Sequence, residues 1–270
     1  MKSGFSLYLN PKCDSSRSLY SKRSSQVDLI RFFSRIISPG ATIIDVGANI
    51  GYLTTYFSDL TANSGKVLAL EPDSRAFCFL KRNLSLNNCV NTTPYLLALS
   101  DHVGTSNLYL SSNRTGNNVL YELSKDRLDE PQIRSSVVVE TTTLDEIFVS
   151  TTFTDQTILK IDVEGFELNV LRGAEQLLKS VDNLITVMEY TPRLMLQAGT
   201  SLQDFSNFCE DHKLLVFQIM PGGNLLSLDA QGLKQLNRKL MSNPDNFLHE
   251  DLVLVNENNS DDLLLRNVTT

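Results

Sequence analysis

A glycine-bearing turn beside an acidic side chain is the first feature of this sequence that could bind a ligand. Residues 42–51 read T-I-I-D-V-G-A-N-I-G, an apolar run that leads into Gly47 and Gly51. Glycines in such a turn let the backbone come close to a ligand because no Cβ intervenes, and a helix after the turn offers unpaired N–H groups. Glu71 ends the next apolar run, twenty residues past Gly51. A carboxylate there is placed to accept hydrogen bonds from both hydroxyls of a ribose, so the two features together predict a nucleoside-containing ligand.

The same turn favours one kind of nucleoside. No two glycines are separated by a single residue, so the G-x-G-x-x-G motif of dinucleotide sites is absent, as is the P-loop motif of triphosphate sites. Asp45, an acid inside the turn, suits a ligand whose tail carries an ammonium and a sulfonium and does not suit a pyrophosphate. S-Adenosylmethionine is such a ligand. We expect Gly47 and Gly51 to seat its methionine part and Glu71 to hold its ribose.

Acidic side chains also end two later apolar runs. Asp162 and Glu164 stand at the end of the first, and Glu189 ends the second. Open α/β sheets bind ligands at the carboxyl ends of their strands, and methyl transfer to a hydroxyl benefits from aligned reactants and a general base. The candidate catalytic residues are Asp162, Glu164, Glu189 and His102, the histidine that directly follows Asp101.

A metal-assisted reaction is an alternative at these strand ends. Asp162 and Glu189 could share a Mg²⁺ ion that binds the acceptor oxygen. Two carboxylates without a third ligand in the sequence give little support to such a site, and we predict no metal.

The elements that must position these residues alternate between apolar strands and amphipathic helices. This alternation predicts an α/β fold, a doubly wound and mostly parallel seven-stranded sheet with helices on both faces. The predicted strands are 42–46, 66–70, 94–99, 158–163, 184–189, 214–220 and 251–255, with extra strands at 108–110 and 136–143.

The chain divides into three parts by composition and periodicity. Residues 1–40 are predicted to be an arm and a helix that cover the site, and residues 257–270 a flexible acidic tail. The domain between them, residues 41–256, carries an insertion at 106–146 on the substrate side.

Composition excludes several classes of protein. The 270 residues are 41% hydrophobic and 20% charged, and no apolar run approaches the length that spans a membrane. The net charge of −7 argues against a nucleic-acid partner, which needs a dense cationic face. With four scattered cysteines and no apolar leader, we expect a cytoplasmic protein with reduced thiols. The pattern favours no particular oligomeric state.

Four segments in this order resemble the FkbM family of S-adenosylmethionine-dependent methyltransferases. They are D-V-G-A-N-I-G at 45–51, E-P at 71–72, A-L-S-D at 98–101 and L-K-I-D-V-E-G-F-E at 159–167, and the resemblance covers roughly residues 42–256. It implies the class I methyltransferase (Rossmann-like) variant of the doubly wound fold, with the last strand, 251–255, antiparallel. It also implies O-methylation.

The resemblance further implies roles for individual residues. Asp45, Gly47, Asn49 and Gly51 would line the methionine part of the cofactor, with Asp162 nearby. The ribose would lie at Glu71 and Pro72, and the adenine at Ser100 and Asp101. Residues 113–118 resemble, loosely, an Asn/Gly-rich segment of the family. The expected substrate-binding residues are Asn113, Asn117 and Tyr190.

The expected function is therefore methyl transfer to a hydroxyl of a small-molecule or sugar-like acceptor. A NAD(P)-dependent or nucleotide-sugar-modifying enzyme on the same fold is one alternative, although the Tyr-x-x-x-Lys spacing from Tyr121 to Lys125 falls in the polar insertion and not on a periodic helix. A non-catalytic binding module with a relict pocket is the other alternative.

Overall fold

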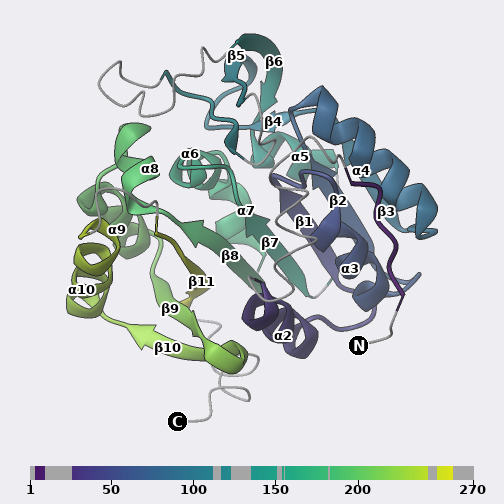
Figure 1. Cartoon of the computed structure of the whole chain (residues 1–270). Helices are drawn as coiled ribbons and strands as arrows, with labels where there is room; N and C mark the ends of the chain where they lie inside the picture. The colour runs from purple at the N-terminus through teal and green to yellow at the C-terminus, as the bar shows by residue number, and fades with distance from the viewer. Residues whose placement is uncertain are drawn as a thin grey trace.

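An eight-stranded sheet, with strand order β10-β9-β11-β8-β7-β1-β2-β3, forms the centre of the computed structural model (Figure 1). The structure describes residues 4–9, 26–111, 117–122, 135–150, 154, 156–181, 183–242 and 248–257. Five strands run parallel, from β3 through β2, β1 and β7 to β8, and β11 lies antiparallel between β8 and β9. The strands are β1 (Thr42–Val46), β2 (Lys66–Leu70), β3 (Thr92–Tyr95), β7 (Thr157–Ile161), β8 (Leu184–Tyr190), β9 (Leu214–Met220), β10 (Asn224–Leu228) and β11 (Glu250–Asn256).

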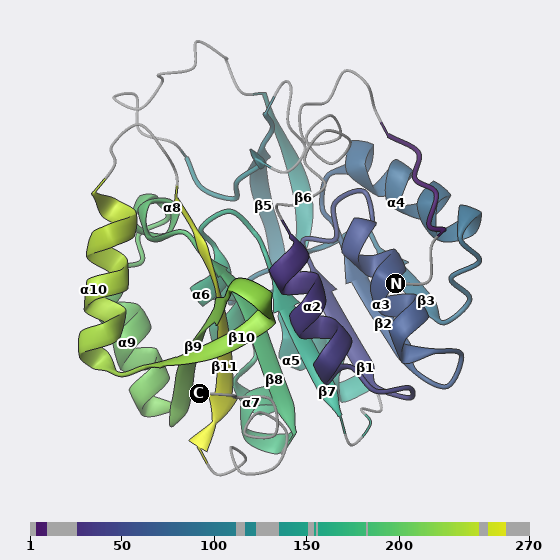
Figure 2. The same ribbon diagram turned by 60° about the horizontal axis from the view of Figure 1, so that its bottom comes forward.

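Helices cover both faces of this sheet (Figure 2). All five residues of β1 are buried, as are those of β7, because each face has apolar side chains packed on it. On one face, Phe33 and Phe57 pack over Ile43; on the other, Leu171 and Phe205 belong to the larger core cluster. The helices are α2 (Val27–Ile36), α3 (Tyr52–Thr61), α4 (Ser74–Leu86), α5 (Leu144–Ser150), α6 (Glu167–Arg172), α7 (Glu175–Ser180), α8 (Pro192–Gln197), α9 (Leu202–Asp211) and α10 (Ala230–Met241). The predicted doubly wound architecture with an antiparallel last strand is confirmed.

Two details of the predicted sheet are wrong. Residues 94–99 form two strands, since β3 ends at Tyr95 and β4 (Ala98–Leu99) joins a separate three-stranded sheet with order β4-β6-β5. Pro94 has no N–H to donate, which suits its place in β3 at the edge of the main sheet. The eighth strand, β10, is an addition to the seven predicted, and it pairs antiparallel with β9 across the short helix η3 (Pro221–Gly223).

The insertion supplies the other two strands of the small sheet. β5 (Gly104–Tyr109) and β6 (Ser136–Thr142) pair antiparallel, close to the strands predicted there. Residues 112–116 and 123–134 of the insertion lie outside the described residues, and so does the predicted tail apart from Glu257. In the described part of the chain, every helix is too short or too polar to cross a lipid bilayer.

Candidate functional site

The turn between β1 and α3 has the close-approach geometry expected from its glycines. Gly47 has φ +77°, and its N–H and that of Ala48 both donate to the Leu70 carbonyl at 3.0 Å. A Cβ at Gly47 would lie 1.9 Å from the carbonyl oxygen of Asp162. Only glycine fits there, because the turn and the loop after β7 lie back to back.

Glu71, which follows β2, contacts this turn from the neighbouring strand. Its side chain is 6% exposed, and it accepts hydrogen bonds from the N–H of Asn49 (Oε2, 2.8 Å) and of Asp73 (Oε1, 2.8 Å). Asn49 makes its contact from a left-handed conformation, φ +50°, which asparagine tolerates. Each carboxylate oxygen can accept about two hydrogen bonds. One acceptor site therefore remains on each oxygen, enough for a vicinal diol.

Lys160 is the main site residue that the sequence reasoning missed. The side chain is 6% exposed, and its Nζ lies 3.2 Å from Asp45 Oδ1, 3.5 Å from Asp162 Oδ2 and 3.2 Å from the Gly47 carbonyl oxygen. Burial alone would lower the pKa of this amine, but the charges of Asp45 and Asp162 raise it above its ordinary value. Asp45 is fully buried, and its other oxygen accepts from the hydroxyl of Thr54 at 2.6 Å. The two acids and the turn are thus held together by one ammonium group.

A signal for this pair was present in the sequence. Asp45 and Lys160 are the charged residues of two otherwise uncharged strands, and the parallel register of β1 and β7 places them directly opposite each other. Opposite charges in neighbouring buried strands predict a pair, but only once the strands are known to be neighbours.

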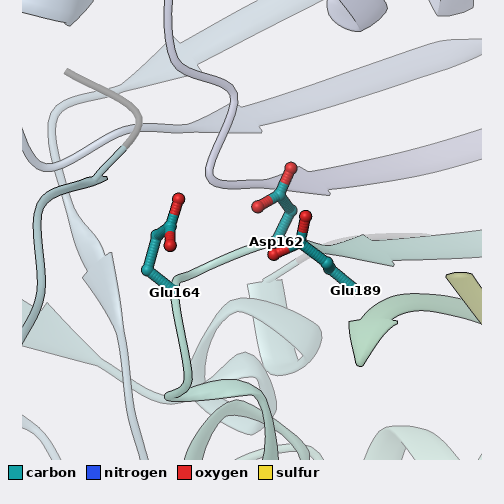
Figure 3. A group of neighbouring side chains, drawn as sticks. All are labelled: Asp162, Glu164 and Glu189. Atoms are coloured by element: carbon teal, nitrogen blue, oxygen red, sulfur yellow. The ribbon is translucent and has the colours of Figure 1, made fainter. Parts of the chain in front are cut away.

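The structure brings three of the four predicted catalytic residues together (Figure 3). One carboxylate oxygen each from Asp162, Glu164 and Glu189 lies within 4.8 Å of the others. Glu164 has φ +55° and Gly165 φ +99°, and a Cβ at Gly165 would lie 2.6 Å from the backbone of Leu194. The loop after β7 therefore turns sharply at Gly165, where its backbone packs against α8. Three carboxylates at this spacing can hold a hydroxyl group, share a proton or coordinate a divalent cation. The absence of a metal stays a prediction.

A small pocket opens beside this acidic cluster, at the carboxyl ends of β7 and β8. Glu189 sits in it with 18% of its side chain exposed, 3.7 Å from His249 Nε2. Burial, and then the charges of Asp162 and Glu164, raise the pKa of Glu189 well above its ordinary value. The lining residues come from α2, β7, β8 and β11 and from residues next to their ends: Gln26, Leu29, Lys160, Ile161, Asp162, Val187, Met188, Glu189, His249 and Asp251.

The fourth candidate, His102, belongs to a separate group near the end of β4. Its Nδ1 lies 2.8 Å from Asp101 Oδ1 and 3.1 Å from Ser100 Oγ, while Asn169 donates to Asp101 Oδ2 at 3.3 Å. Burial alone would raise the pKa of Asp101, but hydrogen bonds from His102 and Ser100 lower it. Oδ1 of Asp101 thus has two partners and Oδ2 has one, so by the count used for Glu71 one acceptor site remains on Oδ2, where an adenine amino group could donate.

Tyr190 is placed away from the site, and its predicted contact with the substrate is corrected. The ring is 1% exposed, packs on Phe205 with ring centroids 5.5 Å apart, and its hydroxyl donates to Asn237 at 2.8 Å. Alternation along β8 turns Tyr190 into the core on the opposite face from Glu189.

The Asn-rich segment contacts the residues that follow β2. Asn118, which the sequence reasoning did not single out, donates to Asp73 Oδ2 at 2.7 Å and accepts from the Ser111 N–H at 2.8 Å. Asn117 is half-buried beside it, whereas Asn113 lies outside the described residues. Pro72 is half-buried between Glu71 and Asp73. The insertion is therefore fastened to the end of β2.

Residues 45–212 match the family model described as the methyltransferase FkbM domain. This match spans more than half of the chain. The chain belongs to the FkbM methyltransferase family. Two curated relatives are similar to about half of the chain. Methyltransferase sdnD of Sordaria araneosa is 32% identical over 157 residues, 50% of this chain and 60% of that protein. Methyltransferase 1 of Beauveria bassiana is 28% identical over 145 residues, 49% of this chain and 58% of that protein. The matches thus span about three fifths of each relative.

Solved structures of methyltransferases resemble the chain more distantly. A FkbM methyltransferase from Methylobacillus flagellatus is 14% identical with a TM-score of 0.46, covering 80% of this chain and 44% of its own. A precorrin-6y C5,15-methyltransferase from Geobacter metallireducens is 12% identical with a TM-score of 0.47, covering 93% and 94%.

S-Adenosylmethionine is the methyl donor of the FkbM family, and the described residues fit it. Glu71 retains two acceptor sites for the ribose diol. The Gly47 turn lets the backbone approach closely, and among the described residues the acids at these strand ends outnumber the cation Lys160, which suits a ligand with a positively charged tail.

The buried acids of this FkbM protein predict how its stability depends on pH. Burial raises the pKa of Glu71 to about 8, and those of Glu167 and Asp251 to about 7, from ordinary values of 4.5 for Glu and 3.8 for Asp. At pH values between the ordinary and the raised pKa of each group, the folded protein retains a proton that the unfolded chain has released. The free energy of unfolding should therefore fall as pH rises from about 5 to 8, by on the order of 3 kcal/mol for Glu167 alone.

Chemical denaturation of the ligand-free protein at several pH values tests this dependence. Glu167→Gln keeps an oxygen to accept from the N–H groups of Val163 and Gly165, and it should flatten the slope. The exposed Glu146 provides the matched control, since Glu146→Gln should leave the slope unchanged. Equal slopes in the wild type and in Glu167→Gln would contradict the prediction.

Proposed function

We propose that this chain catalyses O-methylation of a hydroxyl group on a small-molecule or sugar-like acceptor, with S-adenosylmethionine as the donor. The observation that carries the proposal is the position of Asp162. Its backbone carbonyl abuts the Gly47 turn, while its side chain lines the pocket that holds Glu189. One loop therefore adjoins both the turn at residues 47–51, the proposed cofactor turn, and a pocket whose acidic groups suit a hydroxyl group.

The proposed cofactor contacts come from three strand ends. Glu71 would accept hydrogen bonds from the ribose hydroxyls, with Pro72 beside it, and the turn after β1 would hold the methionine part. Ser100 and Asp101 remain the proposed neighbours of the adenine. S-Adenosylmethionine, when bound, supplies an activated methyl group, so the chain itself needs no nucleophile or redox group.

The chain's own task is to orient the acceptor and to take up its proton. Glu189 is the proposed general base, because a carboxylate with a raised pKa accepts a proton from a hydroxyl more readily than an ordinary one. Asp162 and Glu164 would orient the hydroxyl through their neighbouring oxygens. His249, half-exposed beside Glu189, would pass the proton on to solvent.

The alternatives have less support. Membership of a methyltransferase family argues against a nicotinamide-dependent enzyme, and the hydroxyl of Tyr121 donates to the Glu164 carbonyl at 3.2 Å rather than standing free as a proton donor. A binding module with a relict pocket would form no methylated product, so detection of a product would exclude that alternative.

Incubation of the full chain with methyl-labelled S-adenosylmethionine and a panel of hydroxylated acceptors tests the proposal. We expect a labelled product heavier by one CH₂ group, and a rate about 10²–10⁴-fold lower in Glu189→Gln with cofactor affinity retained. Glu250→Gln, on the neighbouring strand and paired with Lys239, is the matched control and should keep the wild-type rate. A wild-type rate in Glu189→Gln would remove Glu189 as the base; no product from any hydroxylated acceptor would remove O-methylation.

A further inference from the structure

The N-terminal segment Gly4–Leu9 lies along α4 through two asparagine side chains one helical turn apart. Asn87 Oδ1 accepts from the Ser6 N–H at 3.1 Å, and its Nδ2 donates to the Ser6 carbonyl at 2.8 Å. Asn83 repeats the pattern with Tyr8, accepting from its N–H at 2.6 Å and donating to its carbonyl at 3.3 Å. Each side-chain amide thus replaces the peptide group of a neighbouring β-strand.

The spacing of the four residues makes this pairing possible. Four residues of helix rise about 6 Å, and two residues of strand advance about 6.6 Å. Asparagines at 83 and 87 therefore match alternate residues of an extended segment. Phe5, the residue between Gly4 and Ser6, adds an edge-on contact with the ring of Tyr56 on α3, with centroids 6.4 Å apart.

Asn83 makes one further contact, and it is with the cofactor turn. The same Nδ2 donates to the carbonyl of Ile50 at 2.7 Å, and the Asn83 side chain is fully buried. Inside the turn, the next N–H, that of Gly51, donates to the Ala48 carbonyl at 2.9 Å. The peptide between Ile50 and Gly51 is therefore fixed from within by Ala48 and from outside by Asn83.

We propose that Asn83 is a positioning residue for the cofactor turn, and that docking of Gly4–Leu9 on α4 is coupled through it to cofactor affinity. The proposal rests on the placement of S-adenosylmethionine at residues 47–51. With Tyr8 bound, the Asn83 amide is held on both sides and keeps the Ile50 carbonyl in place before the cofactor arrives. Without Tyr8, the amide can rotate, and the ligand must then order the turn as it binds.

Titration calorimetry of full-chain variants with S-adenosylhomocysteine tests this coupling. Asn83→Ala should weaken binding about tenfold, because a buried carbonyl loses its partner. Tyr8→Pro removes the N–H that donates to Asn83 Oδ1, and it should weaken binding about threefold to tenfold. Tyr8→Ala is the matched control: it also removes the exposed ring but keeps the N–H, and it should bind like the wild type.

A second measurement separates positioning from general loss of structure. Amide hydrogen exchange of the ligand-free protein should become faster at Gly51 in both Asn83→Ala and Tyr8→Pro, with strands β1 and β7 unchanged. Wild-type affinity and exchange in Tyr8→Pro would overturn the coupling, and the same result in Asn83→Ala would overturn the positioning role. No binding of S-adenosylhomocysteine by the wild type would instead overturn the cofactor site, and this inference with it.

Discussion

Replacing Lys160 with methionine should lower the free energy of unfolding by about 3–5 kcal/mol. Asp45 is fully buried, and among the described residues Lys160 is the cation paired with it, at 3.2 Å. Methionine preserves the apolar stem and removes the ammonium, which leaves a buried carboxylate without its counter-charge. The carbonyl of Gly47 loses a donor in the same step, so the cofactor turn should loosen as well. Urea unfolding of the ligand-free protein measures the change.

Two further variants make this result specific to the buried pair. Lys66→Met removes an exposed lysine at the start of β2 and should change stability by less than about 0.5 kcal/mol. The double variant with Asp45→Asn removes both charges while an amide oxygen can still accept from Thr54, and it should be more stable than Lys160→Met alone. If the double variant lost as much stability as the two single variants together, Lys160 and Asp45 would not stabilise the fold as a pair.

Glu71→Ala should weaken binding of S-adenosylhomocysteine about a hundredfold or more. Two hydrogen bonds to the ribose hydroxyls would be lost, each contributing about 1.5 kcal/mol, and a factor of ten in affinity corresponds to about 1.4 kcal/mol. The N–H of Asn49 would also lose its acceptor, which frees the turn at a second point. Titration calorimetry of the wild type and the variant measures the difference.

A ligand that lacks one hydroxyl separates the ribose contact from the loss of the turn. The wild type should bind the 2′-deoxy analogue of S-adenosylhomocysteine about tenfold more weakly than the parent compound. Glu71→Ala should bind the two compounds nearly equally, because the group that distinguishes them is gone. Undiminished discrimination in the variant would place the ribose elsewhere.

Most of the sheet could be predicted because strand and helix periodicity are local properties. The bounds of β1 and β2 agree with the prediction to the residue, and those of β9 do as well. The error at residues 94–99 arose from an apolar run, P-Y-L-L-A-L, that has no punctuation where the chain leaves one sheet for another. β10 was missed because a short run, N-L-L-S-L, after Pro221-Gly222-Gly223 reads equally well as a loop.

The side chains of the site were predicted less evenly than the strands. Glu71 and the acids Asp162, Glu164 and Glu189 follow from their positions at strand ends, and the structure gathers the three acids as expected. Tyr190 also ends a strand, but alternation turns it into the core toward Asn237. A position at a strand end places a residue at a known edge of the sheet. Side chains alternate between the two faces along a strand, so the direction of the last side chain depends on the exact residue at which the strand ends.

The sequence by itself determined the doubly wound fold, the glycine turn and the acidic strand ends, because each is encoded within a few neighbouring residues. Only the tertiary structure decided that Lys160 neutralises Asp45 and that Asn83 joins Tyr8 to Ile50. These contacts join residues far apart in the chain. They depend on which strands become neighbours, and in which register, and local periodicity does not specify that.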